Sequence, residues 1–304
     1  MYQLGISLLF FVVTLHTQSL KPKIAFTFDD RYPRSNVMFD SEEGNRMVLD
    51  HLSEHNIKGA YFVAASMLES ETGRNVLTAW DNAGHVIANH SYSHQNYHSD
   101  NVSIENYKND FLKADTLLSS YKSFRKLYRF PMLREGNTID KRDGFRETLT
   151  ENNYQIGYVT VDNTEWFINN TIRQRLANGD SIDVDAYKRI YIDHLYNLAV
   201  EYDSLALSMF ARQIPHIMLV HNNITSALFL GDLIQKFKDE DWEIVDASEA
   251  FSDELYLSKP DVIWQRGQSI LFSIAKERGL ITDETKTFNI TSEEILEKQL
   301  EALE

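Results

Sequence analysis

Two adjacent carboxylates, Asp29 and Asp30, directly follow an apolar run that is typical of a buried strand. Side chains alternate between the two faces of a strand, so we expect these carboxylates to point to opposite faces and to take different roles. Considered alone, the pair is also explained by a polar turn after a strand. Carboxylates in such a place can bind a metal ion or act as a general base.

Two histidines, His90 and His94, lie four residues apart directly after another apolar run. In a helical turn this spacing brings two imidazoles to one metal ion. The chain contains its own control, because His51 and His55 have the same spacing on a predicted helix that packs outside the sheet and needs no metal. His98 continues the spacing, and we expect it to face solvent.

Three further polar residues end three other apolar runs: Arg129, which is followed by Phe130 and Pro131, then Asp162, and then His221. Each has an ordinary explanation, as a surface ion pair, an Asx turn or a histidine at a strand end. Together with the two pairs, however, they place polar groups at the ends of five predicted strands. Active sites of parallel α/β barrels lie at this end of the strands, so the pattern predicts one site.

These residue types can carry out metal-assisted hydrolysis. Asp30, His90 and His94 form a carboxylate–bis-histidine set that suits zinc and is also compatible with cobalt, nickel or iron. A metal lowers the pKa of a bound water and polarises a carbonyl, and Asp29 would accept the water proton as general base. His221 would protonate the leaving nitrogen and, as a cation, stabilise the tetrahedral intermediate.

Two charged residues would support this chemistry. Arg129 would hold Asp29 in place and keep it ionised, and Asp162 would orient or tune the charge of Arg129 or His221. The predicted reaction is hydrolysis of an amide or an ester, and the residues do not decide between the two.

The rest of the sequence predicts the frame that positions these residues. Seven short runs rich in Ile, Val, Phe and Tyr alternate with helical patterns, which indicates a parallel α/β sheet and, when it closes, a barrel. The predicted strands are Ile24–Asp29, Gly59–Ala64, His85–Asn89, Lys126–Phe130, Gln155–Val161, His216–Val220 and Trp242–Val245. The predicted helices between them are Glu43–Asn56, Val76–Ala83, Ser103–Tyr121, Arg142–Asn153 and Leu228–Asp239.

Two stretches interrupt this alternation. Residues 167–215 separate the fifth and sixth strands, and we expect a loop, Asn169–Asp183, followed by one long helix, Val184–Ala211, that packs as a flank or a lid. Residues 253–304 form a predicted helical extension at the C-terminal side of the barrel. Its predicted helices are Ser269–Arg278 and Ser292–Leu303.

The charge and the cysteine count exclude several classes of function. The 304-residue chain has 30 Lys and Arg against 45 Asp and Glu, a formal net charge of -15, and no cysteine. Such acidity is unfavourable for binding nucleic acid or an anionic membrane surface. Without cysteine, thiol nucleophiles, Cys-zinc sites and iron–sulfur clusters are excluded.

The first 19 residues contain no Asp, Glu, Lys or Arg, and Leu4–Leu15 is almost continuously apolar. The run is shorter than the roughly 20 residues that span a bilayer, and it suits the apolar core of a secretory signal. A buried first strand or helix is the alternative. We expect residues 1–19 to be a signal peptide or N-terminal anchor and residues 20–252 to form the barrel. The protein would then be exported to the periplasm or the outside of a bacterium.

In order along the chain, the five constellations resemble the motifs of the polysaccharide deacetylases, carbohydrate esterase family 4. The resemblance covers about residues 23–250, and the five motifs together are highly specific. It implies a distorted seven-stranded (β/α) barrel and a divalent metal, usually zinc. It also implies removal of N-acetyl from GlcNAc or MurNAc units, or of O-acetyl from xylan. The matching segments are Thr27-Phe28-Asp29-Asp30, His90-Ser91-Tyr92-Ser93-His94, Arg129-Phe130-Pro131, Asp162–Trp166 and Leu219-Val220-His221.

The resemblance implies the same base, acid and metal ligands as the residue types do. It also implies that Pro131 and Trp166 belong to the substrate groove, and that Leu219 belongs to an apolar pocket for the acetyl methyl group. Glu165 stands where the fourth motif of the family has a second Asp. The partner would be an acetylated glycan or oligosaccharide.

Two features depart from the family. After the first motif the family usually has Gly-Pro, whereas this chain has Arg31, Tyr32 and Pro33. Arg31 either reads an anionic group of the substrate or narrows the groove, or it is an outward-pointing surface residue. The second departure is the insert, residues 167–215, which would cap the site and favour short or soluble substrates.

Two alternative functions remain at this level. A closed pocket would favour a hydrolase of a small-molecule amide on the same barrel. A broken metal or acid–base set would favour a glycan-binding relative without catalysis.

Overall fold

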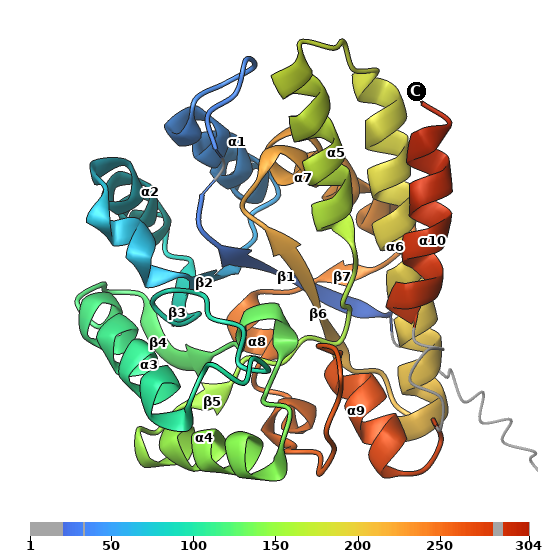
Figure 1. Cartoon of the computed structure of the whole chain (residues 1–304). Helices are drawn as coiled ribbons and strands as arrows, with labels where there is room; N and C mark the ends of the chain where they lie inside the picture. Colours follow the sequence, from blue (N-terminus) through green and yellow to red (C-terminus); the bar gives the residue numbers. More distant parts are fainter. Residues whose placement is uncertain (1–20, 33, 282–287, 304) are drawn as a thin grey trace, which may run out of the picture.

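The computed structural model describes residues 21–32, 34–281 and 288–303, so the predicted signal or anchor lies outside the described residues. Strands and helices alternate along the chain, and the helices surround a central parallel sheet (Figure 1). This arrangement confirms the predicted α/β class. The strands are β1 Lys23–Asp30, β2 Ala60–Val63, β3 Val86–Asn89, β4 Phe124–Tyr128, β5 Gln155–Ile156, β6 Pro215–His221 and β7 Glu243–Ile244.

All strand pairs are parallel, and the order across the sheet is β5-β4-β3-β2-β1-β6, with β7 pairing with the start of β1. The segment after β5 then crosses to β6, where Val161 forms a bridge with Met218. The backbone N–H groups of Thr160 and Val161 both donate to Ile217 O, at 3.1 and 3.0 Å. These contacts close the curved sheet toward a distorted barrel, as predicted.

The predicted fifth strand, Gln155–Val161, is divided between two neighbours. Its first two residues pair with β4, and Val161 pairs with β6 after a bend at Thr160. A Cβ atom on Gly157 would lie 2.4 Å from the ring of Phe62, so the close approach of the chain to this ring requires a residue without a side chain.

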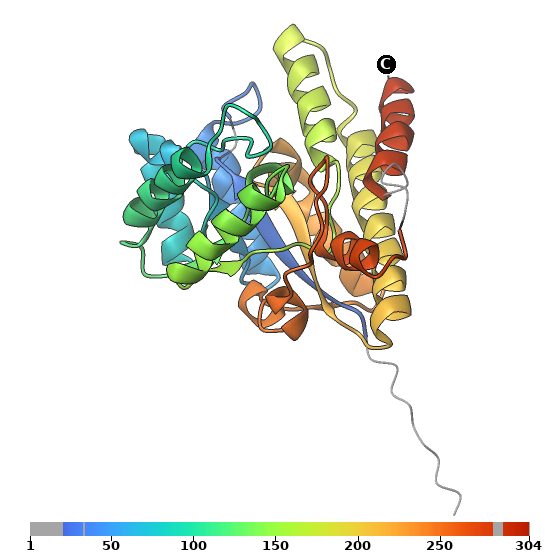
Figure 2. The same ribbon diagram turned by 60° about the horizontal axis from the view of Figure 1, so that its bottom comes forward.

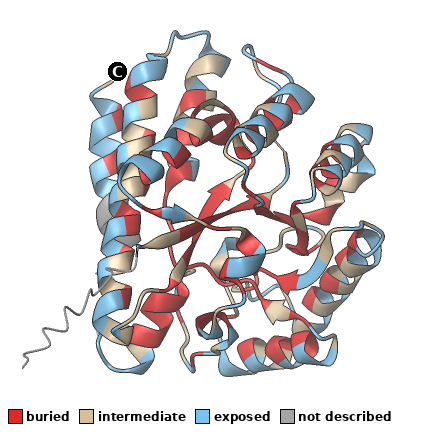
Figure 3. Cartoon of the chain, turned by 180° about the vertical axis from the view of Figure 1, so that it is seen from behind, coloured by how far each residue is buried: buried red, intermediate tan, exposed pale blue. Residues whose placement is uncertain are grey.

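The helices bury one side against the sheet or a neighbouring helix and expose the other (Figure 3). Most begin where a Ser, Thr, Asp or Asn side chain accepts a backbone N–H, as Ser103 does from Asn106 at 3.1 Å. The helices are α1 Ser41–Glu54, α2 Glu71–Asn82, α3 Ile104–Leu118, α4 Ile139–Glu151, α5 Glu165–Asn178, α6 Val184–Phe210, α7 Ile224–Asp239, α8 Ala247–Ala250, α9 Ile270–Glu277 and α10 Phe288–Glu301.

One prediction for the insert is wrong. The stretch Asn169–Asp183 was expected to be a loop, but most of it belongs to α5. Asn169 favours loops by its local hydrogen bonding, yet here its side chain accepts from the backbone N–H of Ile224 at 3.3 Å, at the start of α7. Gly179, in the left-handed conformation (φ 83°), ends the helix and is the signal that could have revealed it.

The second part of the insert forms the predicted long helix. One side of α6 is buried at helical spacing, with Tyr187, Tyr191, Leu195 and Tyr202 among its buried residues. This side packs against the neighbouring helices α7 and α10 (Figures 1 and 2). The helix is therefore a flank of the barrel.

Candidate active site

The polar residues predicted from five strand ends meet at the carboxyl edge of the sheet. Asp29 and Asp30 end β1, and His221 ends β6 directly opposite Asp29 in the strand register. His90 follows β3, and Arg129 follows β4. Because all strands are parallel, these ends lie on one side of the molecule, as the sequence predicted.

Asp30, His90 and His94 form a candidate metal site, in which one ligand atom from each lies within 4.8 Å of the others. Asp30 Oδ1 is 2.8 Å from His94 Nε2 and 3.4 Å from His90 Nε2. This oxygen is buried, and no contact to it has ordinary hydrogen-bond geometry, although both imidazole nitrogens face it. Burial favours the neutral acid, but the two imidazoles outweigh it and hold the pKa of Asp30 well below its ordinary value.

The orientation of His90 is set from behind the site. Its Nδ1 lies 2.8 Å from the backbone carbonyl oxygen of Arg129, which can accept the ring N–H. This contact leaves Nε2 with its lone pair directed at the carboxylates, the arrangement typical of a metal-binding histidine.

The predicted helical turn between the two histidines is wrong, because the segment after β3 is a loop. Asn89 Oδ1 accepts from Ser91 N at 2.8 Å, and Ser91 Oγ accepts from His94 N at 2.9 Å. With Ser91 and His94 in the left-handed conformation (φ 65° and 59°), the loop brings the imidazole centres within 5.0 Å. His98 lies outside the metal cluster and is half-buried, not facing solvent as predicted.

The expectation that Asp29 and Asp30 point to opposite faces is also wrong. Asp30 leaves the strand with φ 76°, which breaks the alternation of side chains. As a result both carboxylates approach His90 Nε2, at 3.7 Å from Asp29 and 3.4 Å from Asp30. Their partners nevertheless differ, so their roles can differ.

Asp29 is buried and paired with Arg129. The Arg129 Nη1 donates to Asp29 Oδ1 at 2.6 Å and to Thr27 Oγ1 at 2.8 Å, and its Nε donates to Gly157 O at 2.8 Å. The guanidinium also stacks 3.9 Å from the ring of Phe62. Burial lowers the pKa of Arg129, and the nearby charge of Asp29 offsets part of this effect. The guanidinium remains the cation of this ion pair.

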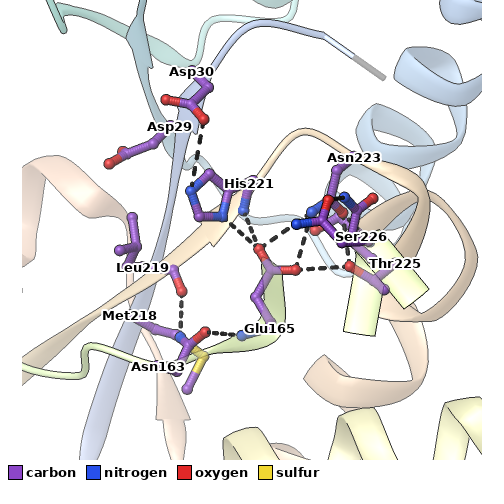
Figure 4. Close-up of polar contacts among 12 residues, drawn as sticks. Asp29, Asp30, Asn163, Glu165, Met218, Leu219, His221, Asn223, Thr225 and Ser226 are labelled. Atoms are coloured by element: carbon purple, nitrogen blue, oxygen red, sulfur yellow. Dashed lines mark hydrogen bonds and ion pairs between the residues drawn. The ribbon is translucent and has the colours of Figure 1, made fainter. Parts of the chain in front are cut away.

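The carboxylate that contacts His221 is Glu165, at the first turn of α5 (Figure 4). Its Oε1 lies 2.6 Å from His221 Nδ1 and accepts from the His221 backbone N–H at 2.8 Å. Its Oε2 accepts from Thr225 Oγ1 at 2.8 Å and from Asn223 Nδ2 at 3.0 Å. Glu165 is itself fully buried, so its two oxygens are held by these four donors.

This environment makes His221 strongly basic. Burial lowers the pKa of His221, but the hydrogen bond and charge of Glu165, with the charges of Asp30 and Asp29, raise it to about 10. The other ring nitrogen, Nε2, faces Asp30 Oδ2 at 3.9 Å. His221 therefore presents a cationic N–H toward the candidate metal site.

Asp162 lines the same cavity as His221. It is buried at the end of the segment that bridges to β6, and its negative charge raises the pKa of Arg129. The prediction that it tunes the charge of Arg129 therefore has electrostatic support, whereas the ring of His221 is held by Glu165. The sequence signal for Glu165 was its place next to Trp166 in the fourth motif.

A cavity of about 800 Å³ opens over these residues. Three of the four predicted substrate-binding residues, Arg31, Trp166 and Leu219, line it. The fourth, Pro131, is buried and is not part of the lining formed by the described residues, whereas the turn that follows it, residues 132–134, is.

The sequence did not predict that the C-terminal extension forms part of this cavity. Residues 266–268, before α9, line it, and Gly267 lies so close to Met132 that a Cβ would be 1.8 Å from its carbonyl oxygen. Glycine is therefore required where the extension meets the turn after β4.

Within the described part of the chain, no helix is long and apolar enough to cross a membrane.

Comparison with known proteins gives a consistent result. Residues 16–155 match the sequence profile of the polysaccharide deacetylase family. The matched segment includes Asp29, Asp30, His90, His94 and Arg129, and it ends before Asp162 and His221.

A peptidoglycan-N-acetylglucosamine deacetylase of Bacillus cereus is 27% identical over 149 residues. This alignment covers 47% of the chain and 51% of the relative, so it spans about half the length of that protein.

Two solved structures share the fold. A chitin deacetylase of Colletotrichum lindemuthianum has a TM-score of 0.52 at 17% identity. The match covers 77% of this chain and 89% of the chitin deacetylase chain. A peptidoglycan deacetylase of Bacillus subtilis has a TM-score of 0.50 at 19% identity, and covers 76% and 90%.

Proposed function

We propose that the chain is a member of the polysaccharide deacetylase family, whose profile it matches over residues 16–155, and that it hydrolyses an acetyl amide on a carbohydrate, most simply the N-acetyl group of a GlcNAc- or MurNAc-type sugar. One observation carries this proposal. The Asp30, His90 and His94 cluster lies between a buried carboxylate, Asp29, and a cationic imidazole, His221. A base, an acid and a metal-ligand set in one cavity are the groups that amide hydrolysis needs.

The donor set fits a divalent metal. It consists of one carboxylate oxygen and two imidazole nitrogens, and the carboxylate oxygen is buried and faces both nitrogens. This set suits zinc and also accepts cobalt, nickel or iron. When bound, such a metal activates a water and polarises the acetyl carbonyl.

Asp29 takes the role of general base in this proposal. Its Oδ1 is occupied by Arg129, and its Oδ2, 3.7 Å from His90 Nε2, faces the metal-ligand cluster. Arg129 holds this carboxylate in place, and an ionised carboxylate in this position can accept a proton from water.

His221 takes the role of general acid. Its Nδ1 is held by Glu165, so Nε2 carries the proton that is transferred to the leaving amide nitrogen. Before transfer, the same N–H and its positive charge stabilise negative charge on the acetyl oxygen. Glu165 orients the ring and keeps it protonated.

The test measures metal content and acetate release on the same preparation. The chain is purified, its metal is counted, and acetate is assayed from chitooligosaccharides, peptidoglycan and acetylxylan. One divalent ion per chain and acetate from an N-acetylated substrate are the expected results. Bound metal without acetate from any of the three contradicts carbohydrate deacetylation and favours a small-molecule amide. No bound metal after addition of zinc or cobalt contradicts the hydrolase and favours a glycan-binding role.

We also propose that the protein is exported, on the support of the apolar run Leu4–Leu15 in the sequence. Cell fractionation of a bacterial host, with sequencing of the N-terminus of the mature chain, tests this. Recovery in the cytosol with an intact N-terminus would refute it.

A further inference from the structure

The wall of the cavity is rich in arginine. Five of the chain's 15 arginines line it, and no lysine of the described residues does. In a chain with a net charge of -15, this is a local reversal of charge. The five are Arg31, Arg34, Arg134, Arg173 and Arg266, and we call them the arginine wall.

The arginine wall is assembled from four separate parts of the fold. Arg31 and Arg34 lie in the loop after β1, and Arg134 lies in the turn after β4. Arg173 belongs to α5, and Arg266 precedes α9 in the C-terminal extension. A single basic stretch of sequence therefore does not explain their meeting at one cavity.

These arginines have no carboxylate partner among the residues that the structure describes. None of the five forms an ion pair with any residue that the structure describes, and Arg134 Nε is buried without a hydrogen-bond partner. Three guanidiniums elsewhere are neutralised within the protein, since Arg142 pairs with Asp143, Arg146 with Glu135 and Arg212 with Asp253.

The acidic residues of the lining do not neutralise the wall. They are Asp29, Asp30, Asp162 and Glu293. The three aspartates lie at the strand ends, where Asp29 is paired with Arg129 and Asp30 belongs to the metal cluster. Glu293, on α10, is the acidic residue of the lining that lies away from the strand ends.

We propose that the substrate carries an anionic group, a carboxylate or a phosphate, close to the acetylated nitrogen, and that the arginine wall binds it. The inference rests on the proposed deacetylase function. A guanidinium pairs with either anion through two parallel N–H donors, and it remains charged throughout the physiological pH range. Trp166, 41% exposed in the same lining, offers a flat apolar surface for the sugar ring. A neutral acetylated chain would leave the five guanidiniums without counter-charge.

The first experiment compares a neutral substrate with two substrates that carry added anionic groups. The neutral probe is a tetramer of N-acetylglucosamine. One anionic probe carries lactyl carboxylates on alternate sugars, and another carries a phosphate at its reducing end. We expect kcat/KM to be at least about tenfold higher for one anionic probe than for the neutral tetramer. The probe with the higher kcat/KM identifies the anion. Amidation of the carboxylates should remove a carboxylate preference. Equal or higher kcat/KM for the neutral tetramer overturns the inference.

The second experiment removes charge from the wall. Arg173→Gln and Arg266→Gln should each lower kcat/KM for the favoured anionic probe about three- to tenfold and leave the neutral tetramer within about twofold. Arg189→Gln, an exposed arginine on α6 outside the cavity, is the matched control and should change neither. An equal fall for both probes would assign these arginines a structural role and overturn the inference.

A binding measurement separates failure of this inference from failure of the proposed function. Calorimetry with the same probes on the full chain requires no turnover. If no probe releases acetate, the deacetylase proposal fails. Tighter binding of an anionic probe that Arg173→Gln weakens would still support the arginine wall. Equal binding of anionic and neutral probes overturns it.

Discussion

Two histidine pairs with the same spacing have different surroundings in this fold. His90 and His94 lie in a loop at the carboxyl end of β3, where both imidazoles face one oxygen of Asp30. The loop is held by side-chain hydrogen bonds and two left-handed residues. A carboxylate from β1, two strands away in the sheet, thus completes the candidate metal-ligand set.

The other pair, His51 and His55, lies at the end of α1, which packs on α7. His51 Nε2 lies 3.0 Å from the carbonyl oxygen of Ala227, and His55 Nδ1 lies 2.9 Å from Lys238 Nζ. Within the described residues this pair belongs to no metal-ligand cluster. Spacing is therefore insufficient, and the neighbouring carboxylate distinguishes the two pairs.

Removing that carboxylate should have the largest effect. Asp30→Asn takes away the negative charge, and asparagine tolerates the left-handed backbone at this position. We expect zinc affinity to fall by about 100-fold or more, beyond the typical cost of losing an outer hydrogen bond, with acetate release falling to background. Metal analysis at fixed free zinc checks this. Full metal content in the variant would remove Asp30 from the site.

The next largest effect separates acid catalysis from metal binding. His221→Ala should lower kcat by about 10²- to 10⁴-fold, because the leaving nitrogen loses its proton donor. The metal content should not change, since the proposed ligands are Asp30, His90 and His94. Loss of metal in this variant would overturn the division of roles.

Glu165→Gln tests how a carboxylate changes the pKa of the histidine beside it. The Glu165 charge raises the pKa of His221, so its removal should lower that pKa. His221 acts in its protonated form, so the alkaline limb of the pH profile for kcat should move to lower pH. We expect kcat to fall by about 10-fold or more with metal retained. An unchanged alkaline limb would show that His221 does not titrate in that limb.

His85 extends the comparison to a buried histidine without a carboxylate neighbour. Burial lowers the pKa of His85 to about 4, and its Nδ1 accepts from Gly59 N at 3.1 Å. The unfolded chain binds this proton near pH 6.5, so stability should fall as the pH drops from about 6.5 to 4. Between pH 7 and 5 the loss is about 2 kcal/mol. Urea unfolding of wild type and His85→Asn checks this, and equal pH dependence in both would contradict it.

The smallest effect should come from the pair without a metal. His51→Ala removes one partly buried hydrogen bond to Ala227, which costs about 1 kcal/mol of unfolding free energy. Metal content and acetate release should stay at wild-type values. A fall in bound metal in this variant would mean that the four-residue spacing of two histidines is sufficient for metal binding.

The sequence predicted the frame well because the parallel sheet is buried on both faces, which makes each strand a short apolar run. It also predicted that the polar strand ends converge, since this follows from parallel pairing alone. It did not predict the turn of Asp30 or the loop between His90 and His94, because both depend on single left-handed residues.

The carboxylate of Glu165 and the arginine wall were harder to place. Glu165 reaches His221 only once α5 packs beside β6, and α5 itself was expected to be a loop. Arg266 reaches the cavity because Gly267 lies against Met132, a contact between distant parts of the chain. Local patterns carry no information on such contacts.

The pairing of β1 affects how the chain can be synthesised and folded. This first strand lies between β2 and β6, so one of its edges stays unpaired until residues 215–221 have left the ribosome. The barrel cannot close before then, and contacts between such distant residues form slowly. About two thirds of the chain must therefore remain incompletely folded until β6 is available. In this state a chaperone or a translocation machine can bind it, and a protease can cut it. We expect a nascent chain arrested before β6 to be degraded readily, and one arrested after α10 to resist.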